Sequence, residues 1–347
     1  MESSTGDVSL PISLGTKNGK IVVVMARIPR VGLHEPFFID SLDGRFHLAH
    51  ISKSIESEQD VLVRPLHYDE NDDRIEFILI EKFISKYLSI ETVSDKTHFI
   101  FHMSRCGSTL AAQMLSTVNR FYVLSEPTII NEILDPNLEL PNGISKWDLL
   151  KGVINAISIF KPDHCEHLFI KFRSWNIFFL SEILSLYPGI TWSFIHRNGL
   201  EVMESILRDQ PGWIRGRDRN ISFFSKVLGI SEDEIRLMSS SEYSARILGA
   251  ICKEASINRS GNSAYISYED IPNRLPELLE KPFKLKLTSD ERGSMIKRST
   301  FYSKDKLSKK VFTEDSLEKR SSMSDLDIIN ATRFIEIERK GIFTKTI

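Results

Sequence analysis

A short polar loop at residues 102–109 has the residue types that bind an anion. An apolar run, 98–101, precedes the loop and an apolar-periodic segment, 110–118, comes after it, which predicts strand, tight loop and helix. Gly107 lets the backbone approach a ligand closely. Because the first N–H groups of a helix have no partner within the helix, the start of this one is expected to attract a negative group.

Three side chains of the loop add to this expectation. Arg105 supplies a planar cation whose N–H groups match the oxygens of phosphate or sulfate. Ser108 and Thr109 can cap the helix and donate their hydroxyls. A single loop of this kind is more often an ordinary strand-to-helix turn with a surface arginine, so the assignment depends on the residues further along the chain.

Polar side chains also close the strands expected after the loop. Those strands are the apolar runs at 121–124, 167–170 and 191–195. Glu126 follows the first, Lys171 and Arg173 follow the second, and Arg197 follows the third. In open α/β sheets ligands gather at the carboxyl ends of the strands, so these groups are expected to line a site. Glu126 is placed where a general base works, whereas the three cations would bind an anion and repel Mg²⁺.

Ser205 indicates a second anion site. It follows Arg197 by eight residues, about two turns into the next expected helix, so its hydroxyl and the guanidinium can meet one phosphate. Two separate anion sites suit a nucleotide that carries phosphates at two positions. A magnesium-dependent nucleotide triphosphatase would need a Walker A lysine and a strand-end aspartate, and the sequence has neither here. A P-loop kinase-like phosphotransferase is therefore the weaker alternative.

The alternation of apolar runs with helices of about ten to fifteen residues predicts parallel βαβ units. We therefore expect an α/β fold with three layers and a central parallel sheet, including a further strand at 263–268. Residues 1–92 have several short apolar runs between turn residues, which predicts a small N-terminal α+β portion with residues 1–20 frayed. Residues 93–347 then make up the α/β domain.

The composition is that of a globular protein without strong charge. The 347 residues are 41% hydrophobic and 27% charged, with a net charge of −2, so no nucleic-acid partner is expected. No apolar run is long enough for a membrane span, and the first residues lack a signal-peptide pattern. Three scattered cysteines fit a reducing compartment, which makes a cytoplasmic location the expectation.

Three further features have simpler interpretations. Four histidines in the N-terminal portion lack metal-ligand spacing, so no metal site is expected: His34, His47, His50 and His67. The Gly- and Arg-rich stretch 210–220 is expected to be a mobile loop or lid that helps to shape the acceptor pocket. Within it, Trp213 could stack on a sugar or an aromatic ring, although a buried structural tryptophan is as common.

The two anion motifs resemble those of the sulfotransferase family. Residues 102–110 look like the family's 5′-phosphosulfate loop, and 194–205 look like its 3′-phosphate motif, in which an arginine closes a strand and a serine follows eight residues later. The chain is most similar to the bacterial-type branch, over roughly residues 95 to 320. The resemblance implies a P-loop-like sulfotransferase fold. It also implies the donor 3′-phosphoadenosine 5′-phosphosulfate (PAPS), which gives its sulfuryl group to a hydroxyl or amine and leaves as the bisphosphate PAP.

The resemblance further implies roles for individual residues. The 5′-phosphosulfate would be held by Arg105, Cys106, Gly107, Ser108 and Thr109, and the 3′-phosphate by Arg197 and Ser205. Lys171 matches a lysine that assists the leaving group in many members. Glu126 with Pro127 is similar to a glutamate–proline pair of carbohydrate-type members, so the acceptor would be a small molecule or a carbohydrate.

The chain departs from the cytosolic members at the position of their catalytic histidine, where it has Arg173. An arginine does not deprotonate an acceptor, so the base must be another group: Glu126 first, with His102 or His196 behind it. This departure leaves a catalytically inactive nucleotide-binding homologue as a further alternative.

A second departure concerns the glycine-flanked basic motif that closes the 3′-phosphate site of the cytosolic members. The sequence offers only weak substitutes for it, in Arg292 before Gly293 or in Lys297 and Arg298.

Overall fold

The computed structural model describes residues 8–28, 37–40, 75–90, 93, 95–301 and 323–344. The four histidines of the N-terminal portion (His34, His47, His50 and His67) lie outside the described residues. The chain divides into two compact units. The first comprises Met1–Phe99, Leu115–Phe172 and Glu182–Ile190, and the second Ile100–Met114, Arg173–Ser181 and Thr191–Ile347. The domain boundary at residue 92 stays a prediction.

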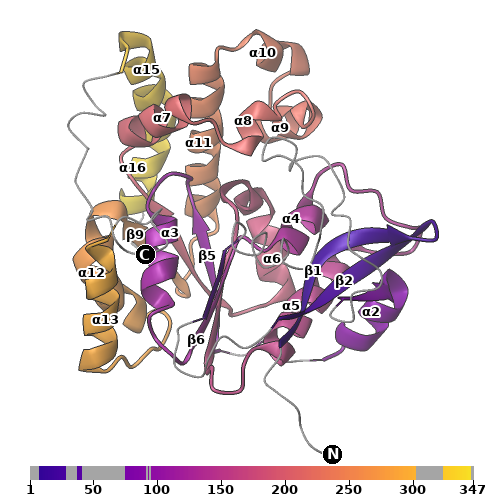
Figure 1. Cartoon of the computed structure of the whole chain (residues 1–347). Coiled ribbons are helices and arrows are strands. Elements are labelled where there is room, and N and C mark those ends of the chain that lie inside the picture. Colours follow the sequence, from indigo (N-terminus) through magenta and orange to yellow (C-terminus); the bar gives the residue numbers. More distant parts are fainter. Residues whose placement is uncertain are drawn as a thin grey trace, which may run out of the picture. The chain divides into compact units, whose positions relative to one another are not determined.

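Six strands form the main sheet, in the order β3-β6-β7-β5-β8-β9, and Figure 1 labels β5, β6 and β9 among them. Their bounds are β3 Phe37–Asp40, β6 Phe121–Ser125, β7 His167–Lys171, β5 Thr97–His102, β8 Thr191–His196 and β9 Ser263–Ser267. The register is parallel where β3 pairs with β6, β6 with β7, and β8 with β9. The α/β fold with a central parallel sheet and flanking helices is thereby confirmed.

The sequence made these strands predictable because four of them are buried along their whole length. Every residue of β5, β6, β7 and β8 is buried. Strands that are covered on both faces have continuous apolar runs instead of the alternation of a half-exposed strand. The strand β5 begins in the first unit and ends in the second, where the polar loop follows it.

The first unit also contains a small antiparallel sheet, which corrects the expectation of a frayed N-terminus for residues 8–20. Strand β1 (Val8–Lys17) pairs with β2 (Lys20–Ile28), and β2 pairs with β4 (Ile75–Leu79). The hairpin turns at Asn18 and Gly19, with φ of 52° and 72°. Asn-Gly is the preferred sequence for this two-residue turn, because both positions need positive φ. That pair was the signal that the sequence-based expectation overlooked.

The helices of the first unit are α2 Ile80–Tyr87, α4 Thr128–Leu134, α5 Lys146–Phe160 and the part of α6 (Leu180–Leu186) that begins at Glu182. Both α4 and α5 contact β1, and α2 contacts α5. Between β7 and β8 the chain forms the 3₁₀ helix η1 (Ser174–Phe179), which leads directly into α6.

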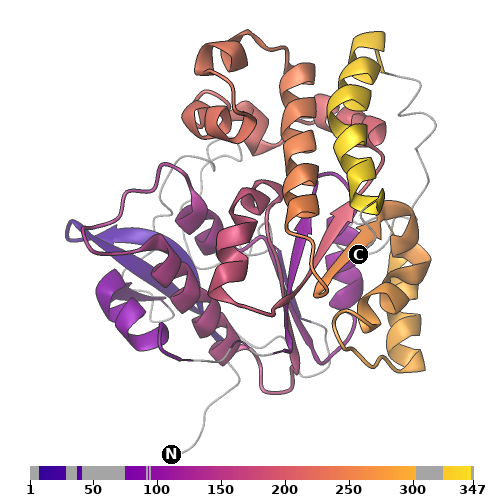
Figure 2. The same ribbon diagram turned by 180° about the vertical axis from the view of Figure 1, so that it is seen from behind.

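The second unit is mostly helical. Its elements after the loop are α3 Ser108–Leu115, η1, α7 Gly199–Arg208, α8 Gly212–Arg215, α9 Ile221–Leu228, α10 Glu232–Leu237, α11 Ser240–Ile257, η2 Tyr268–Asp270, α12 Ile271–Glu280, α13 Ser289–Ser299, α15 Asp325–Asn330, the π-helix η3 Ala331–Glu336 and α16 Ile337–Thr344. The last three lie along α11 in both ribbon views (Figures 1 and 2). Gly249 makes this approach possible, because a Cβ there would collide with the Phe334 carbonyl oxygen.

The stretch 210–220 is built from α8 and turns, where the sequence predicted a mobile loop or lid. Its Trp213 is only 6% exposed, and the Tyr243 hydroxyl donates to the Trp213 carbonyl oxygen at 3.5 Å. The indole packs near the Tyr243 ring with centroids 6.3 Å apart. Trp213 is therefore a structural tryptophan, the simpler of its two interpretations.

A stacked pair of histidines in the first unit predicts acid sensitivity. The ring nitrogens Nε2 of His98 and Nδ1 of His167 lie 3.0 Å apart, and burial lowers their pKa values to about 3 and about 4. The unfolded chain takes up these protons near pH 6.5, so the free energy of unfolding is highest above that pH and falls as the pH drops toward 4. Urea unfolding at pH 7 and pH 5 should show this loss. It should shrink in His98→Leu and persist in the exposed control His164→Gln; an equal loss in all three proteins would contradict this origin.

Candidate active site

The loop after β5 is fastened to the end of β8 within the second unit. The Met103 backbone N–H donates to the Ile195 carbonyl oxygen at 3.1 Å, and the Cys106 thiol donates to the same oxygen at 3.1 Å. In return, the Arg197 backbone N–H donates to the Met103 sulfur at 3.2 Å. The fold thus brings together the two anion motifs, which lie about ninety residues apart in the sequence.

The loop has an unusual backbone conformation. Ser104, Arg105 and Gly107 have positive φ values of 72°, 46° and 82°. Positive φ costs a non-glycine residue about 1–3 kcal/mol, so the surrounding structure must impose it. Among the described residues five non-glycine positions have positive φ, and three of them, Ser104, Arg105 and Glu126, are residues of the loop or the predicted site. Such strain is typical of functional loops.

The side chains of the loop differ in their access to a ligand. Ser108 is 4% exposed, and Thr109 is partly exposed at the start of α3. Cys106 is fully buried, so its backbone N–H can bind a ligand anion but its thiol cannot reach one. The Ala111 N–H donates to the Gly107 carbonyl oxygen at 3.1 Å, and this is the first hydrogen bond of the helix. The N–H groups before Ala111 therefore lie at the helix N-terminus, where they have no acceptor within the helix.

Arg105 is paired with a carboxylate. Its Nη2 donates to Asp209 twice, to Oδ2 at 2.5 Å and to the carbonyl oxygen at 2.8 Å. Asp209 is the C-cap residue of α7 and its side chain is 56% exposed. A ligand anion at Arg105 must therefore compete with this pair.

Arg197 is paired as well, in a buried place. Its Nε and Nη2 both contact Oε2 of Glu201 at 2.6 Å, and both side chains are at most 6% exposed. The Tyr268 ring lies against the guanidinium, with its centroid 4.0 Å from Cζ of Arg197. Ser205 is half-buried on the face of α7 that Glu201 and Asp209 share, since the three residues are spaced by four. One helix face thus carries the predicted phosphate ligand Ser205 between two carboxylates.

Asn198 is the N-cap residue of α7 and accepts the Leu200 N–H, and a residue that the sequence did not point to also binds this N-terminus. The Gly199 N–H donates to Oε1 of Glu336 at 2.6 Å, and Arg339 holds the same carboxylate at 2.8 Å. Arg339-Lys340 precedes Gly341, so a basic pair beside a glycine lies near the predicted 3′-phosphate motif in the fold. The pair was not predictable as a neighbour, because it lies about 140 residues beyond Arg197.

The weaker substitutes for that motif have other partners. Arg292 pairs with Glu280 at 2.5 Å, and Arg298 donates to Oε1 of Gln113 in α3 at 2.6 Å. Arg298 therefore lies beside the helix of the loop, whereas Arg292 serves the contact between α12 and α13.

Glu126 and Lys171 meet within the first unit, as their strand-end positions predicted. The Lys171 Nζ contacts Oε1 of Glu126 and lies 3.3 Å from the Ser125 hydroxyl oxygen. The Glu126 N–H donates to the Lys171 carbonyl oxygen at 2.6 Å, and Glu126 has φ of +56°. Lys171 is 1% exposed whereas Glu126 is 25% exposed, so the carboxylate is the member that a solvent molecule or substrate can reach.

The two histidines considered as bases are both buried. Nδ1 of His102 accepts the Ser104 N–H at 3.1 Å, so this ring helps to hold the loop. His196 is fully buried, and burial lowers its pKa to about 4. Arg173 is the N-cap residue of η1, where its N–H donates to Oδ1 of Asn176 at 2.8 Å.

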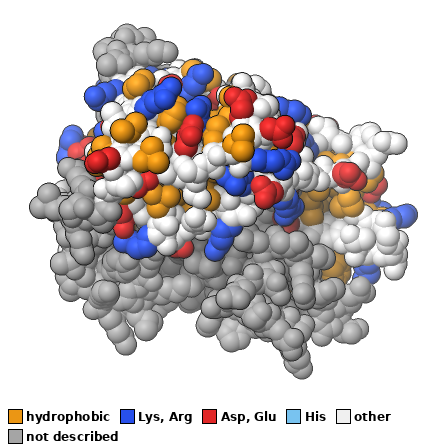
Figure 3. All heavy atoms as spheres, turned by 90° about the horizontal axis from the view of Figure 1, so that it is seen from above, with side chains coloured by type: hydrophobic (Ala, Val, Ile, Leu, Met, Phe, Trp, Pro, Cys, Tyr) orange, Lys and Arg blue, Asp and Glu red, His pale blue; other side chains and the backbone are white. Residues whose placement is uncertain are grey.

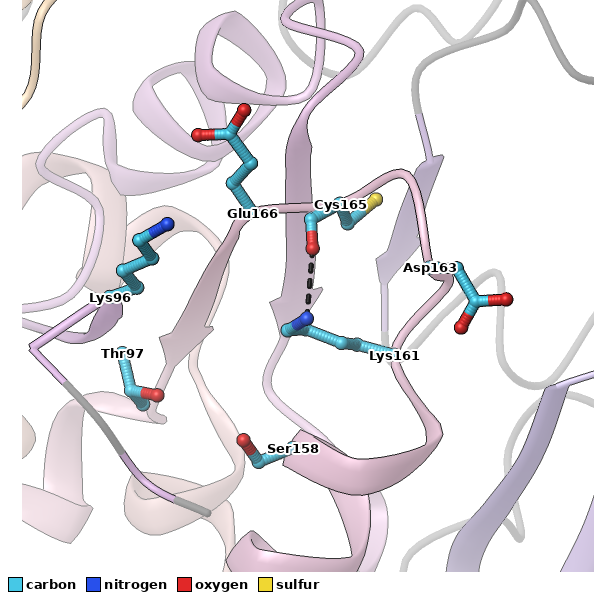
Figure 4. A pocket seen from close by; sticks show the side chains of 7 residues that line it. All are labelled: Lys96, Thr97, Ser158, Lys161, Asp163, Cys165 and Glu166. Carbon is cyan, nitrogen blue, oxygen red and sulfur yellow. Dashed lines mark hydrogen bonds between the residues drawn. The ribbon is translucent and has the colours of Figure 1, made fainter.

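A polar pocket of about 450 Å³ in the first unit lies away from these groups (Figure 4). Its lining residues are Lys96, Thr97, Ser158, Lys161, Asp163, Cys165 and Glu166. Thr97 begins β5 and Glu166 precedes β7, so the pocket lies at the amino end of β7, whereas Lys171 closes its carboxyl end. None of the predicted site residues lines it.

Searches of the described residues for other site types gave no candidate. Within these ranges no three His, Cys, Asp or Glu side chains are grouped to hold a metal ion, and none of the helices has the length and apolar character needed to cross a bilayer. On the face drawn in Figure 3, Lys and Arg side chains are mixed with Asp and Glu among the described residues.

Comparisons with known proteins gave distant structural likenesses. No protein-family model and no curated protein matches the chain. Among solved structures it is similar to a sulfotransferase domain from the curacin biosynthetic pathway, with a TM-score of 0.40 at 13% identity over 72% of this chain and 96% of that one. A sulfotransferase from Alicyclobacillus acidocaldarius gives 0.37 at 13% identity over 70% and 96%. Retinol dehydratase in a complex with retinol and PAP gives 0.38 at 13% identity over 79% and 89%. All three are sulfotransferases or a PAP complex by description, and at these values the likeness assigns no function to this chain.

Proposed function

We propose that this chain is a sulfotransferase that moves a sulfuryl group from PAPS to a hydroxyl or amine of a small molecule or carbohydrate. The observation that carries the proposal is the joining of two arginine-bearing anion motifs at the ends of β5 and β8, through Met103, Cys106 and Ile195. A donor with phosphate groups at two positions needs two such motifs close together. The strained loop and the helix after it are suited to the 5′-phosphosulfate.

The donor would be divided between the motifs. Arg105 and the N–H groups of residues 106–109 hold the 5′-phosphosulfate, with the hydroxyls of Ser108 and Thr109. Arg197 and Ser205 hold the 3′-phosphate. Because a sulfuryl group carries less charge than a γ-phosphate, fixed cations can stabilise it in transfer without the charge of a metal ion.

The chemical step needs a base and a stabilised leaving group. In the proposed step the acceptor oxygen or nitrogen attacks sulfur while the bond from sulfur to the bridging oxygen of the donor breaks, and PAP leaves with that electron pair. Glu126 takes the proton from the attacking hydroxyl or amine, since it is the more exposed member of its ion pair. Lys171 holds Glu126 in place and stabilises negative charge on the bridging oxygen.

Because Asp209 binds Arg105, we expect the wild-type protein to bind PAPS and PAP more weakly than it would without this carboxylate. An exposed ion pair contributes about 0–1 kcal/mol to stability, so Asp209→Asn should fold normally while it removes the negative charge that competes with the phosphosulfate for Arg105. Calorimetric titration should show PAP binding about two- to fivefold tighter. Asp218→Asn, which removes an exposed partner of Arg217, is the matched control and should leave the affinity unchanged. Weaker binding in Asp209→Asn would mean that Asp209 orients Arg105 instead of competing for it.

Transfer itself is tested with PAPS labelled with radioactive sulfur and a panel of hydroxyl and amine acceptors. Label in an acceptor, together with stoichiometric PAP, would support the proposal. PAP binding without transfer to any acceptor, or slow hydrolysis of PAPS to sulfate, would favour the inactive nucleotide-binding homologue, the alternative that Arg173 keeps open. We also propose a cytoplasmic location, because three cysteines scattered along the sequence fit a reducing compartment.

A further inference from the structure

Tyr268 contacts both anion motifs of the second unit. It begins η2, directly after β9, and its ring lies 4.0 Å from the Arg197 guanidinium. The same ring lies against Gly107 in the loop: a Cβ built on Gly107 would be 2.5 Å from Cδ2 and 2.8 Å from Cε2 of Tyr268. One half-buried aromatic ring therefore contacts both the backbone of the loop and the arginine of the other motif.

This contact limits the orientations that Arg197 can adopt. Glu201 binds the guanidinium through Nε and Nη2, each 2.6 Å from its Oε2, while Cζ of Arg197 lies over the Tyr268 ring. Two groups thus hold the guanidinium at once, and together they restrict the direction in which its N–H groups can meet an oxygen ligand. Without the ring, the guanidinium could rotate more freely about its contacts with Glu201.

Gly107 is required for the same arrangement. Its φ of +82° disfavours other residues, and any side chain there would displace the Tyr268 ring. Glycine at position 107 thus allows the loop conformation and also leaves room for the Tyr268 ring.

We propose that Tyr268 is a positioning residue that fixes Arg197 for a 3′-phosphate and so makes the site select nucleotides that carry one. This inference rests on the proposed function, since it assumes that a bisphosphate nucleotide binds here. The aromatic face performs the role and the hydroxyl does not, because the face is what contacts the guanidinium.

Calorimetric titration with PAP and with adenosine 5′-monophosphate, which lacks the 3′-phosphate, tests the inference. Tyr268→Leu should weaken PAP binding about tenfold and leave the monophosphate affinity within twofold, whereas Tyr268→Phe should keep the wild-type preference. Tyr265→Leu is the matched control. Tyr265 lies on β9 with its ring 4.9 Å from Arg259, so its loss removes a similar contact outside the site and should leave the preference unchanged.

The other outcomes separate the two proposals. If the wild type binds PAP, three results would overturn the positioning role. Tyr268→Leu could weaken the binding of both nucleotides equally, or it could leave the preference for PAP over the monophosphate unchanged. Tyr268→Phe could also lose as much PAP affinity as Tyr268→Leu. Failure of the wild type to bind PAP would overturn the donor assignment and this inference together. The Arg197 Nε–H resonance gives a check without nucleotide: it should lose its aromatic ring-current shift in Tyr268→Leu and keep it in Tyr268→Phe.

Discussion

Replacing Arg197 with alanine is expected to weaken PAP binding by about a hundredfold, because truncating one partner of a buried, charged contact costs about 2–5 kcal/mol. The guanidinium is the only charged group that the 3′-phosphate motif assigns to that phosphate, and Tyr268 and Glu201 hold it in place. Separate titrations with PAP and with adenosine 5′-monophosphate should show a lower affinity for PAP and an unchanged affinity for the monophosphate.

The variant needs a control for folding. Removing Arg197 leaves Glu201 charged and 2% exposed, which is expected to cost about 3–5 kcal/mol of stability. The double variant Arg197→Met with Glu201→Leu removes both charges and should recover stability without recovering PAP binding. Arg208→Ala, on the same helix, removes a side chain that is 61% exposed and paired with Glu204, and it should bind PAP normally. Normal PAP affinity in a folded Arg197→Ala protein would exclude this arginine from the donor site.

Glu126→Gln is expected to lower kcat by about 10²–10⁴-fold while the PAP affinity stays within about twofold, because general-base catalysis contributes about that factor and the side chain does not hold the donor. The amide keeps the size of the carboxylate and can still accept from Lys171. Glu166→Gln is the matched control, since Glu166 is also ion-paired in the first unit, to Arg120 at 3.5 Å, but at the amino end of β7.

Lys171→Met separates the two members of that pair. If Lys171 stabilises the leaving oxygen as well as holding Glu126, its loss should lower kcat at least as much as the loss of Glu126, and the double variant should be no worse than the poorer single one. A Glu126→Gln enzyme with normal kcat would move the base to another group. His102 would then be tested first, because it lies beside the loop and His196 is fully buried.

Much of the fold could be predicted from sequence because its central strands are covered on both faces. Continuous apolar runs marked β5, β6, β7 and β8, and the residues that close them placed Lys171 beside Glu126. The loop at 102–109 was visible from glycine and hydroxyl residues between a strand and a helix. These are local signals, and local signals are what a single sequence carries well.

The partners of the site residues were not predictable, since they come from distant parts of the chain or depend on which face of a helix turns inward. Asp209 reaches Arg105 from 104 residues away, and Glu336 reaches Gly199 from 137 residues away. The β1 hairpin escaped for another reason: its Asn-Gly turn lies in a polar stretch that looked frayed, although Leu10 and Ser13 are buried.

The most direct test of the donor assignment is calorimetric titration of the wild-type protein with PAP, with and without magnesium, against ATP. We predict micromolar binding of PAP that does not depend on magnesium and exceeds the binding of ATP. Binding of magnesium-ATP in preference to PAP would contradict the sulfotransferase assignment and favour phosphoryl transfer.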